Sequence, residues 1–187
     1  MAIYVALLRG INVGGKNKIK MAELRQKLEA IGLNRVQTYI QSGNVLFEAN
    51  EEEQVLRQRI EEQIEAGFGI KAAVALRTAD EIRHVAANCP FSEEAVTQAQ
   101  TTAVGESLHV SFLLAEPAQE AVERLEPYKS DNDEYRIIGR EMYLLFHHSI
   151  RDSKLAMNLH KLNVAGTVRN WKTVNKLVAL ADAMESP

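Results

Sequence analysis

Apolar and polar positions follow two periods along residues 1–90, and their order predicts a mixed α+β fold. Residues 3–8 form a continuous apolar run, which is typical of a central strand. Further on, Met21, Leu24 and Leu28 recur at helical spacing, and Gly32 stands where a glycine commonly ends a helix. The whole stretch predicts, in order, strand 3–8, a helix from 21, strands 36–41 and 45–47, a helix capped by Asn50 with Glu53 and ended by residues 67–69, strand 72–76, and a helix capped by Thr78 that runs through about Ala87.

The rest of the chain repeats this order with weaker patterns. It predicts strand 108–114, a short helix with Ala121, Val122 and Leu125, hairpin strands 135–138 and 142–146, a helix marked by Leu155, Leu159 and Leu162, a poor strand at 164–169, and a last helix capped by Asn170. The order βαββαβ is the split-βαβ, ferredoxin-like plan. We therefore expect an α+β chain of tandem ferredoxin-like (βαββαβ) halves with antiparallel sheets, the second half degraded. In the first half the expected strand order is 4-1-3-2. The expected domains are residues 1–90, a polar linker at 91–106 with room for a short helix, and residues 107–187.

One junction supports the repeat. Residues 74–78 and residues 166–170 both place a strand, an arginine and a helix-capping residue at the same spacing. The halves differ in the connection from the first strand to the first helix, which is twelve residues long in the first half (Arg9–Lys20) and about three in the second. Such connections usually have two to six residues. The long loop is therefore the first functional candidate.

The Arg9–Lys20 loop contains three glycines, four cations and no carboxylate. Glycines let backbone N–H groups approach a ligand, and the start of the following helix adds unsatisfied donors and positive potential. These features favour a phosphate-binding loop, although the spacing matches neither a P-loop nor the dinucleotide GxGxxG motif. A flexible surface loop with solvating lysines is the alternative.

The expected topology places other segments of the chain beside this loop. In the ferredoxin-like plan, the loop, the turn at 41–44 and residues 67–69 gather at the same end of the sheet. Side-chain amides in the turn can contribute donors and acceptors, although hairpin formation alone also explains Ser42 and Gly43. Arg9 is expected to contribute most, because arginine binds phosphate bidentately. The candidate ligand-binding residues are Arg9, Asn12, Gly14, Gly15, Lys16, Gln41, Ser42, Asn44 and Arg169, the last only if the halves pack suitably.

Few other residues indicate chemistry. Trp171 is either a packing anchor with its N–H bonded to protein, which we favour, or a platform for a base. His147 and His148 are adjacent on an expected strand and therefore point to opposite faces. Cys89 has no partner at metal-ligand spacing and predicts an inert buried thiol. No catalytic residue can be assigned, and we expect neither a metal nor a cofactor.

Composition narrows the class of protein. The net charge of the 187 residues is −3, hydrophobic residues make up 46% and charged residues 25%, as in ordinary globular proteins. No apolar run approaches a membrane span, and the single cysteine fits a reducing compartment, so we expect a cytoplasmic protein without membrane contact. Two stretches, 1–22 and 153–181, carry basic residues and no acid. They suggest an anion site, although chance clustering on solvated faces is an alternative.

Three blocks of the sequence resemble a bacterial family of uncharacterised proteins. The blocks are Leu7–Lys16, Thr38–Val45 and Thr167–Val174. Together they are similar to the family known as domain of unknown function 1697, with two departures: Lys20 stands where the family often has proline, and Lys172 where it often has asparagine. The resemblance implies an α+β, ferredoxin-related fold and a cytosolic setting, and it implies no activity. Its signature residues include Arg9, Asn12, Gln41, Asn44 and Arg169.

These observations leave three functions open. The first is binding of an anionic, phosphorylated small molecule or nucleic acid through the Arg9–Lys20 loop. The second is a small enzyme that acts on such a ligand, which would require a general acid or base outside the signature blocks. The third is a protein–protein adaptor whose signature residues are structural.

Overall fold

The computed structural model describes residues 1–186, which form two compact units. Unit 1 comprises Met1–His84 together with the residues from Asn175 onward, and unit 2 is Val85–Val174. The division differs from the expected domain ranges, because the C-terminal residues group with the first unit and the 91–106 segment with the second. Each unit is described separately below.

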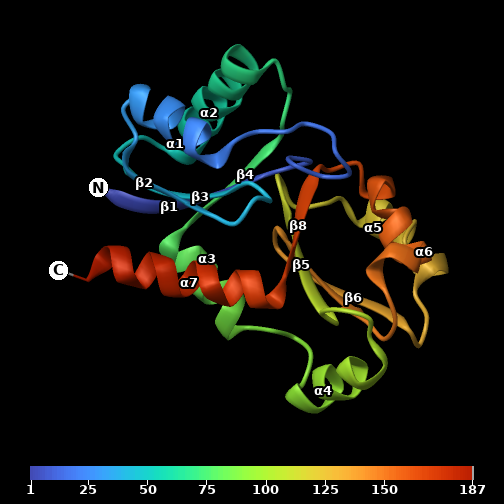
Figure 1. Cartoon of the computed structure of the whole chain (residues 1–187). Helices are drawn as coiled ribbons and strands as arrows, with labels where there is room; N and C mark the ends of the chain where they lie inside the picture. Colours follow the sequence, from blue (N-terminus) through green and yellow to red (C-terminus); the bar gives the residue numbers. More distant parts are fainter. Residues whose placement is uncertain (187) are drawn as a thin grey trace. The chain divides into compact units, whose positions relative to one another are not determined.

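Unit 1 is built on a four-stranded antiparallel sheet with the order β2-β3-β1-β4. This order confirms the 4-1-3-2 arrangement that the ferredoxin-like plan predicts for the first half. The central strand β1 pairs with β3 on one side and with β4 on the other. The elements, labelled in Figure 1, are β1 (Ala2–Leu8), α1 (Met21–Ala30), β2 (Asn34–Tyr39), β3 (Asn44–Ala49), α2 (Glu53–Phe68), β4 (Val74–Thr78) and α3 (Ala79–Ala87), whose last residues belong to unit 2.

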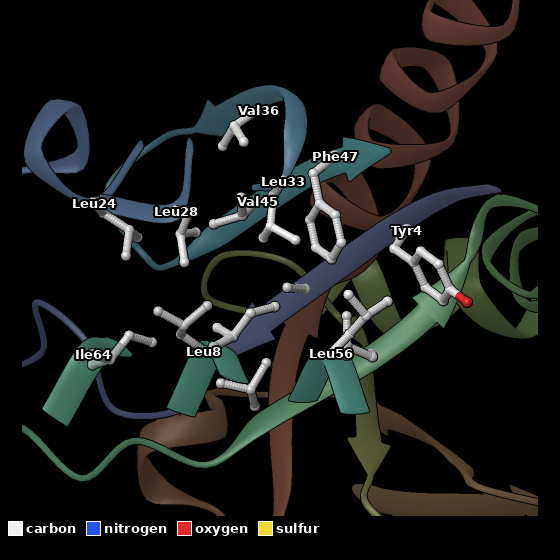
Figure 2. Packing of buried hydrophobic residues seen from close by; sticks show 14 of the residues in the cluster. Tyr4, Leu8, Leu24, Leu28, Leu33, Val36, Val45, Phe47, Leu56 and Ile64 are labelled. Atoms are coloured by element: carbon white, nitrogen blue, oxygen red, sulfur yellow. The ribbon is translucent and has the colours of Figure 1, made fainter. Parts of the chain in front are cut away.

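The helices α1 and α2 cover one face of this sheet because alternate strand residues point toward them. Tyr4, Ala6 and Leu8 of β1 lie in the same buried cluster as Leu24 of α1 and Leu56 of α2. Figure 2 shows this packing, in which the rings of Tyr4 and Phe47 stack with their centroids 5.7 Å apart. Burying each large apolar side chain contributes about 1.5–3 kcal/mol, so this cluster is the main source of unit 1 stability.

The end of the C-terminal helix α7 (Trp171–Glu185) is part of unit 1. Its residues Leu177, Ala181 and Met184 are buried. Arg35 donates to the carbonyl oxygen of Met184 at 2.8 Å, and Arg83 pairs with Asp182 at 2.7 Å. These contacts, which join residues far apart in the sequence, explain why the segment groups with unit 1. The sequence pattern indicates only that the segment is helical, so it was expected in the second half.

Unit 2 carries a second four-stranded antiparallel sheet, with the order β6-β7-β5-β8. Its strands are β5 (Leu108–Leu113), β6 (Asp133–Ile138), β7 (Glu141–Phe146) and β8 (Gly166–Asn170). Its helices are α4 (Glu93–Thr102), α5 (Gln119–Glu123), α6 (Lys154–Met157), the first turn of α7 and the 3₁₀ turns η1 (Glu126–Tyr128), η2 (Ile150–Asp152) and η3 (Leu159–Leu162). The single helix expected around Leu155–Leu162 is instead two short pieces, α6 and η3.

Each sheet contains a buried arginine at the equivalent position of its edge strand. Arg77 of β4 lies opposite Val5 of β1, and Arg169 of β8 lies opposite Val110 of β5. Both side chains are buried, and the Nη1 atom of each donates to the carbonyl oxygen of the preceding residue, at 2.8 and 2.9 Å. The chain is therefore an α+β protein with two sheets that share strand order and this local arrangement.

Candidate functional site

The Arg9–Lys20 loop is folded onto the end of the sheet and is not a loose surface segment. Its two isoleucines, Ile11 and Ile19, are buried in the core of unit 1. Between them, the side chain of Asn12 accepts a hydrogen bond from the N–H of Ile19 at 2.8 Å. Its Nδ2 donates to the carbonyl oxygens of Ile19, at 3.1 Å, and Gln41, at 2.6 Å. Asn12 therefore joins the loop to the turn, as the topology argument requires.

The tip of the loop is a tight turn. The N–H of Lys16 donates to the carbonyl oxygen of Val13 at 3.0 Å, and Gly14 and Gly15 between them have φ angles of 58° and 75°. Two consecutive positive φ angles define a type I′ turn, which glycine adopts without strain. The geometry of this turn accounts for both glycines without any ligand.

The turn that follows β2 is held against the loop by close packing. A Cβ atom on Gly43 would lie 2.8 Å from the Cβ of Leu8, so the turn can approach the strand this closely only with glycine. Asn44 is fully buried, and its Nδ2 donates to the carbonyl oxygen of Tyr39 at 3.1 Å and to Ser42 Oγ at 2.9 Å. Ser42 and Asn44 therefore shape the hairpin.

Loop, turn and helix end together line one shallow hollow of about 620 Å³. Its lining comprises Asn12, Gly15, Lys18, Ile19, Lys20, Glu23, Gln41 and Phe68. These residues come from the Arg9–Lys20 loop, the start of α1, the turn after β2 and the end of α2. The expectation that the loop, the turn and residues 67–69 gather at one end of the sheet is therefore confirmed.

Only some of the candidate residues named from the sequence line the hollow. Asn12, Gly15 and Gln41 belong to its lining. Arg9, Gly14 and Lys16 are exposed elsewhere on the loop, and Ser42 and Asn44 hold the turn. Arg169 belongs to unit 2.

Five further lining residues, Lys18, Ile19, Lys20, Glu23 and Phe68, did not appear by name among the sequence-based candidates. Lys18 and Lys20 lie inside the loop already singled out, and their position just before the helix was the available signal. Glu23 lies in the first turn of α1, and Phe68 is the last residue of α2. Phe68 belongs to the 67–69 segment that the topology argument assigns to this end of the sheet. Nothing in the sequence singles out its side chain, or that of Glu23, as part of the lining.

The charges around the hollow are mixed, with a positive excess. Lys18 and Lys20 are exposed and share the lining with one carboxylate, that of Glu23. Lys20 occupies the N-cap position of α1, and its side chain makes no capping hydrogen bond. The first-turn N–H groups of α1 therefore lack the acceptor that a serine or aspartate cap would supply. Together with the helix dipole, they add positive potential at the rim.

Arg169 is bonded within unit 2. Its Nη1 donates to Thr167 Oγ1 at 2.7 Å and to the carbonyl oxygen of Val168 at 2.9 Å. Burial lowers the pKa of its guanidinium to about 10, which still leaves the side chain charged at neutral pH. The expectation that Arg169 takes part in the loop site stays a prediction.

The surroundings of Trp171 and Cys89, which were also considered from the sequence, fit structural roles for both residues. Trp171 is half-buried, with its ring centroid 6.3 Å from that of Tyr143, which fits the packing role better than a stacking platform. Cys89 is partly buried, and burial raises the pKa of its thiol, as expected for an unreactive cysteine. Within residues 1–186, no three His, Cys, Asp or Glu side chains are arranged to hold a metal ion.

The described helices do not include one that is long and apolar enough to cross a membrane.

Comparison with known proteins gives a family and a fold. The family model described as "Protein of unknown function (DUF1697)" matches residues 1–143. Among solved structures, the chain resembles the conserved bacterial protein SP0830 from Streptococcus pneumoniae, with a TM-score of 0.75 and 24% sequence identity over 97% of this chain and 99% of that one. Identity at this level shows a shared fold alone. No curated protein matches the sequence.

Proposed function

The chain belongs to the DUF1697 family of proteins of unknown function, and we propose that it is a binding protein whose hollow in unit 1 takes a small molecule bearing a phosphate group. One observation carries the proposal: Lys18, Lys20 and the uncapped start of α1 converge on the same hollow. Phosphate at a helix N-terminus accepts hydrogen bonds from the free N–H groups and is stabilised by the dipole. Two lysines beside it neutralise the remaining charge.

In this proposal the residues of the Arg9–Lys20 loop and of the turn after β2 divide into two roles. Lys18, Lys20 and Gln41 contact the ligand from the lining of the hollow. Asn12 joins the loop to the turn, so it acts by positioning these side chains. Arg9 is exposed and outside the lining, so we expect it to contribute less than Lys20, the reverse of the sequence-based expectation.

We further propose that the two units are related ferredoxin-like halves of a tandem repeat. Their common strand order and the matching Arg77 and Arg169 support this relation. In unit 2, the connection between β5 and α5 is residues 114–118, which leaves no counterpart of the long loop. We therefore assign ligand binding to unit 1 and a structural role within unit 2 to Arg169. A cytoplasmic location, suggested by the single cysteine, is part of the same proposal.

A small molecule fits the hollow better than nucleic acid does. Its volume lies in the range of small-molecule sites, about 300–1,000 Å³. Nucleic-acid surfaces carry extended stripes of cations, whereas this lining has two lysines and one glutamate, and the net charge of the chain is −3.

Isothermal titration calorimetry with ribose 5-phosphate, and with ribose as the unphosphorylated control, tests the proposal. We expect ribose 5-phosphate alone to bind. Lys20→Gln should weaken its affinity about 3- to 10-fold, because a charge-assisted contact is lost at a partly exposed site. Lys16→Gln is the matched control, since Lys16 lies on the same loop outside the hollow, and it should change the affinity less than twofold.

Four results would contradict the proposal. Equal effects of Lys16→Gln and Lys20→Gln would indicate diffuse electrostatic attraction without a site. Preference for an oligonucleotide, with a steep loss of affinity between 50 and 200 mM salt, would favour nucleic-acid binding. Release of inorganic phosphate from the bound probe would identify an enzyme, and absence of binding by every phosphate-bearing probe would leave the adaptor hypothesis.

A further inference from the structure

We infer that the ligand of the hollow also carries a planar ring, and that its class is a nucleoside monophosphate. This inference rests on the proposed function and adds the part of the ligand that the phosphate contacts leave unassigned. The observation behind it is Phe68, which lines the hollow together with Lys18 and Lys20. Within the lining it is the one aromatic side chain.

The ring of Phe68 is held in place by its neighbours. Phe68 is the last residue of α2, and the helix ends at Gly69, which has a φ angle of 68°. The ring packs partly against the core of unit 1, and Lys27 Nζ lies over it, 5.5 Å from its centroid. A ring fixed in this way loses little side-chain entropy on binding, and a base can stack on the part of the ring that borders the hollow and is not covered by Lys27.

Gly67 makes room for this arrangement. A Cβ atom at Gly67 would lie 2.7 Å from Lys27 Cδ, so the lysine stem crosses α2 where the helix has no side chain. Glycine inside a helix costs about 0.5–1 kcal/mol relative to alanine. Glycine at position 67 therefore leaves the space in which the Lys27 side chain reaches the Phe68 ring.

Glu23 distinguishes a nucleotide from a simple anion. A carboxylate repels a phosphate group that lies against it, so a ligand filling the whole hollow must present hydrogen-bond donors to Glu23. Sugar hydroxyls and base amino groups are such donors. The lining therefore complements three parts of one molecule: phosphate at the lysines and the helix start, donors at Glu23, and a planar base at Phe68.

Affinity measurements on the unaltered protein test the inference. AMP and UMP are compared with ribose 5-phosphate, which has the phosphate and sugar without the base, and with adenosine, which lacks the phosphate. We expect at least one nucleotide to bind about tenfold or more tightly than ribose 5-phosphate, because stacking of a base on an aromatic ring is worth that much.

The variant Phe68→Leu should remove this advantage and leave ribose 5-phosphate binding within about twofold, since the lysines are untouched. Glu23→Gln should weaken AMP less than Phe68→Leu does, because an amide oxygen still accepts a hydrogen bond. Thermal denaturation of each variant establishes that it is folded. If Phe68→Leu does not fold, the comparison between AMP, UMP and ribose 5-phosphate still decides the inference.

The outcomes separate the two proposals. If ribose 5-phosphate binds as tightly as both nucleotides, the inference is wrong and the phosphate site stands. If adenosine binds as tightly as AMP and ribose 5-phosphate does not bind, the ring contact stands, but the phosphate proposal and the nucleoside-monophosphate class are wrong. If none of the four probes binds, both are wrong.

Discussion

At the scale of single residues, two glycines near the hollow have different reasons for being there. Gly43 has a positive φ of 86°, and a Cβ at this position would lie 2.8 Å from Leu8 Cβ. Gly14 has a φ of 58° and would place its Cβ in open space, with nothing within 4 Å. Both positions favour glycine for its backbone freedom, but close packing adds a second requirement at Gly43 alone.

This difference predicts the effect of alanine at each position. Gly14→Ala should lower the free energy of unfolding by about 1 kcal/mol, the cost of a left-handed conformation. Gly43→Ala should lower it by roughly 2–4 kcal/mol, because overpacking is added to that cost. Urea denaturation of the two variants measures both values. Equal losses would show that the turn moves away from Leu8 without cost.

The buried histidine of unit 2 predicts a pH dependence of stability. His109 packs edge-on against Phe146, and its Nδ1 has no hydrogen-bond partner among the described residues. Burial lowers its pKa below the ordinary value of 6.5. The unfolded chain therefore binds a proton at a higher pH than the folded one does. The contribution of His109 to stability is complete above pH 6.5 and is lost as the pH falls toward the folded pKa.

Denaturation midpoints between pH 5 and 8 test this dependence. The wild-type protein should lose stability below pH 6.5, with a slope from this group of at most about 1.4 kcal/mol per pH unit. His109→Leu should flatten that slope. His148→Leu is the control, because this neighbouring histidine is exposed. An unchanged slope in the His109 variant would assign the pH dependence to other groups.

At the scale of elements, the end of α7 shows which kind of contact fixes a helix. Its buried residues in unit 1 are Leu177, Ala181 and Met184, and its charged residues pair with Arg83 at the surface. Surface ion pairs are worth about 0–1 kcal/mol, whereas truncating a buried leucine leaves a cavity. We therefore attribute the docking of this segment to its apolar face.

One substitution in α7 and one in α3 distinguish the apolar contribution from that of the ion pairs. Leu177→Ala should lower the free energy of unfolding by roughly 2–5 kcal/mol. Arg83→Ala should lower it by about 1 kcal/mol and less at high salt, since exposed pairs are screened. Thermal or urea denaturation at 50 mM and 500 mM salt measures both. A larger loss for Arg83→Ala than for Leu177→Ala would reverse the assignment.

At the scale of the whole molecule, unit 1 consists of two separate chain segments, which predicts which fragments of the chain can fold. Residues 1–84 need the segment from Asn175 onward to complete their unit. A fragment of residues 1–90 lacks Leu177, Ala181 and Met184, so it should melt at a lower temperature than the intact chain or fail to fold. Circular dichroism of the fragment measures this. A fragment that melts like the intact protein would show that the expected 1–90 range is an independent domain.

Much of the fold follows from local patterns in the sequence. Apolar periodicity and turn residues determined the elements of unit 1, because each depends on neighbours within a few positions. The order β2-β3-β1-β4 followed from the restricted ways in which a βαββαβ chain pairs its strands. The loop and turn could be assigned to one end of the sheet for the same reason. The broken helix at Leu155–Leu162 was missed, because leucine spacing does not reveal that the backbone leaves helical geometry at Asn158, where φ is −110° and ψ is 9°.

Which side chains line the hollow was decided by tertiary structure. The direction of each loop residue depends on its own φ and ψ, and Asn12 and Asn17 both adopt positive φ angles that the sequence pattern does not reveal. The bond from Asn12 to Gln41 joins residues 29 positions apart, and topology assigns the 67–69 segment to this end of the sheet without showing that the Phe68 side chain lines the hollow. The sequence alone therefore identified the loop, because its length and charge are local properties. The lining required the folded chain, because it depends on contacts between distant segments.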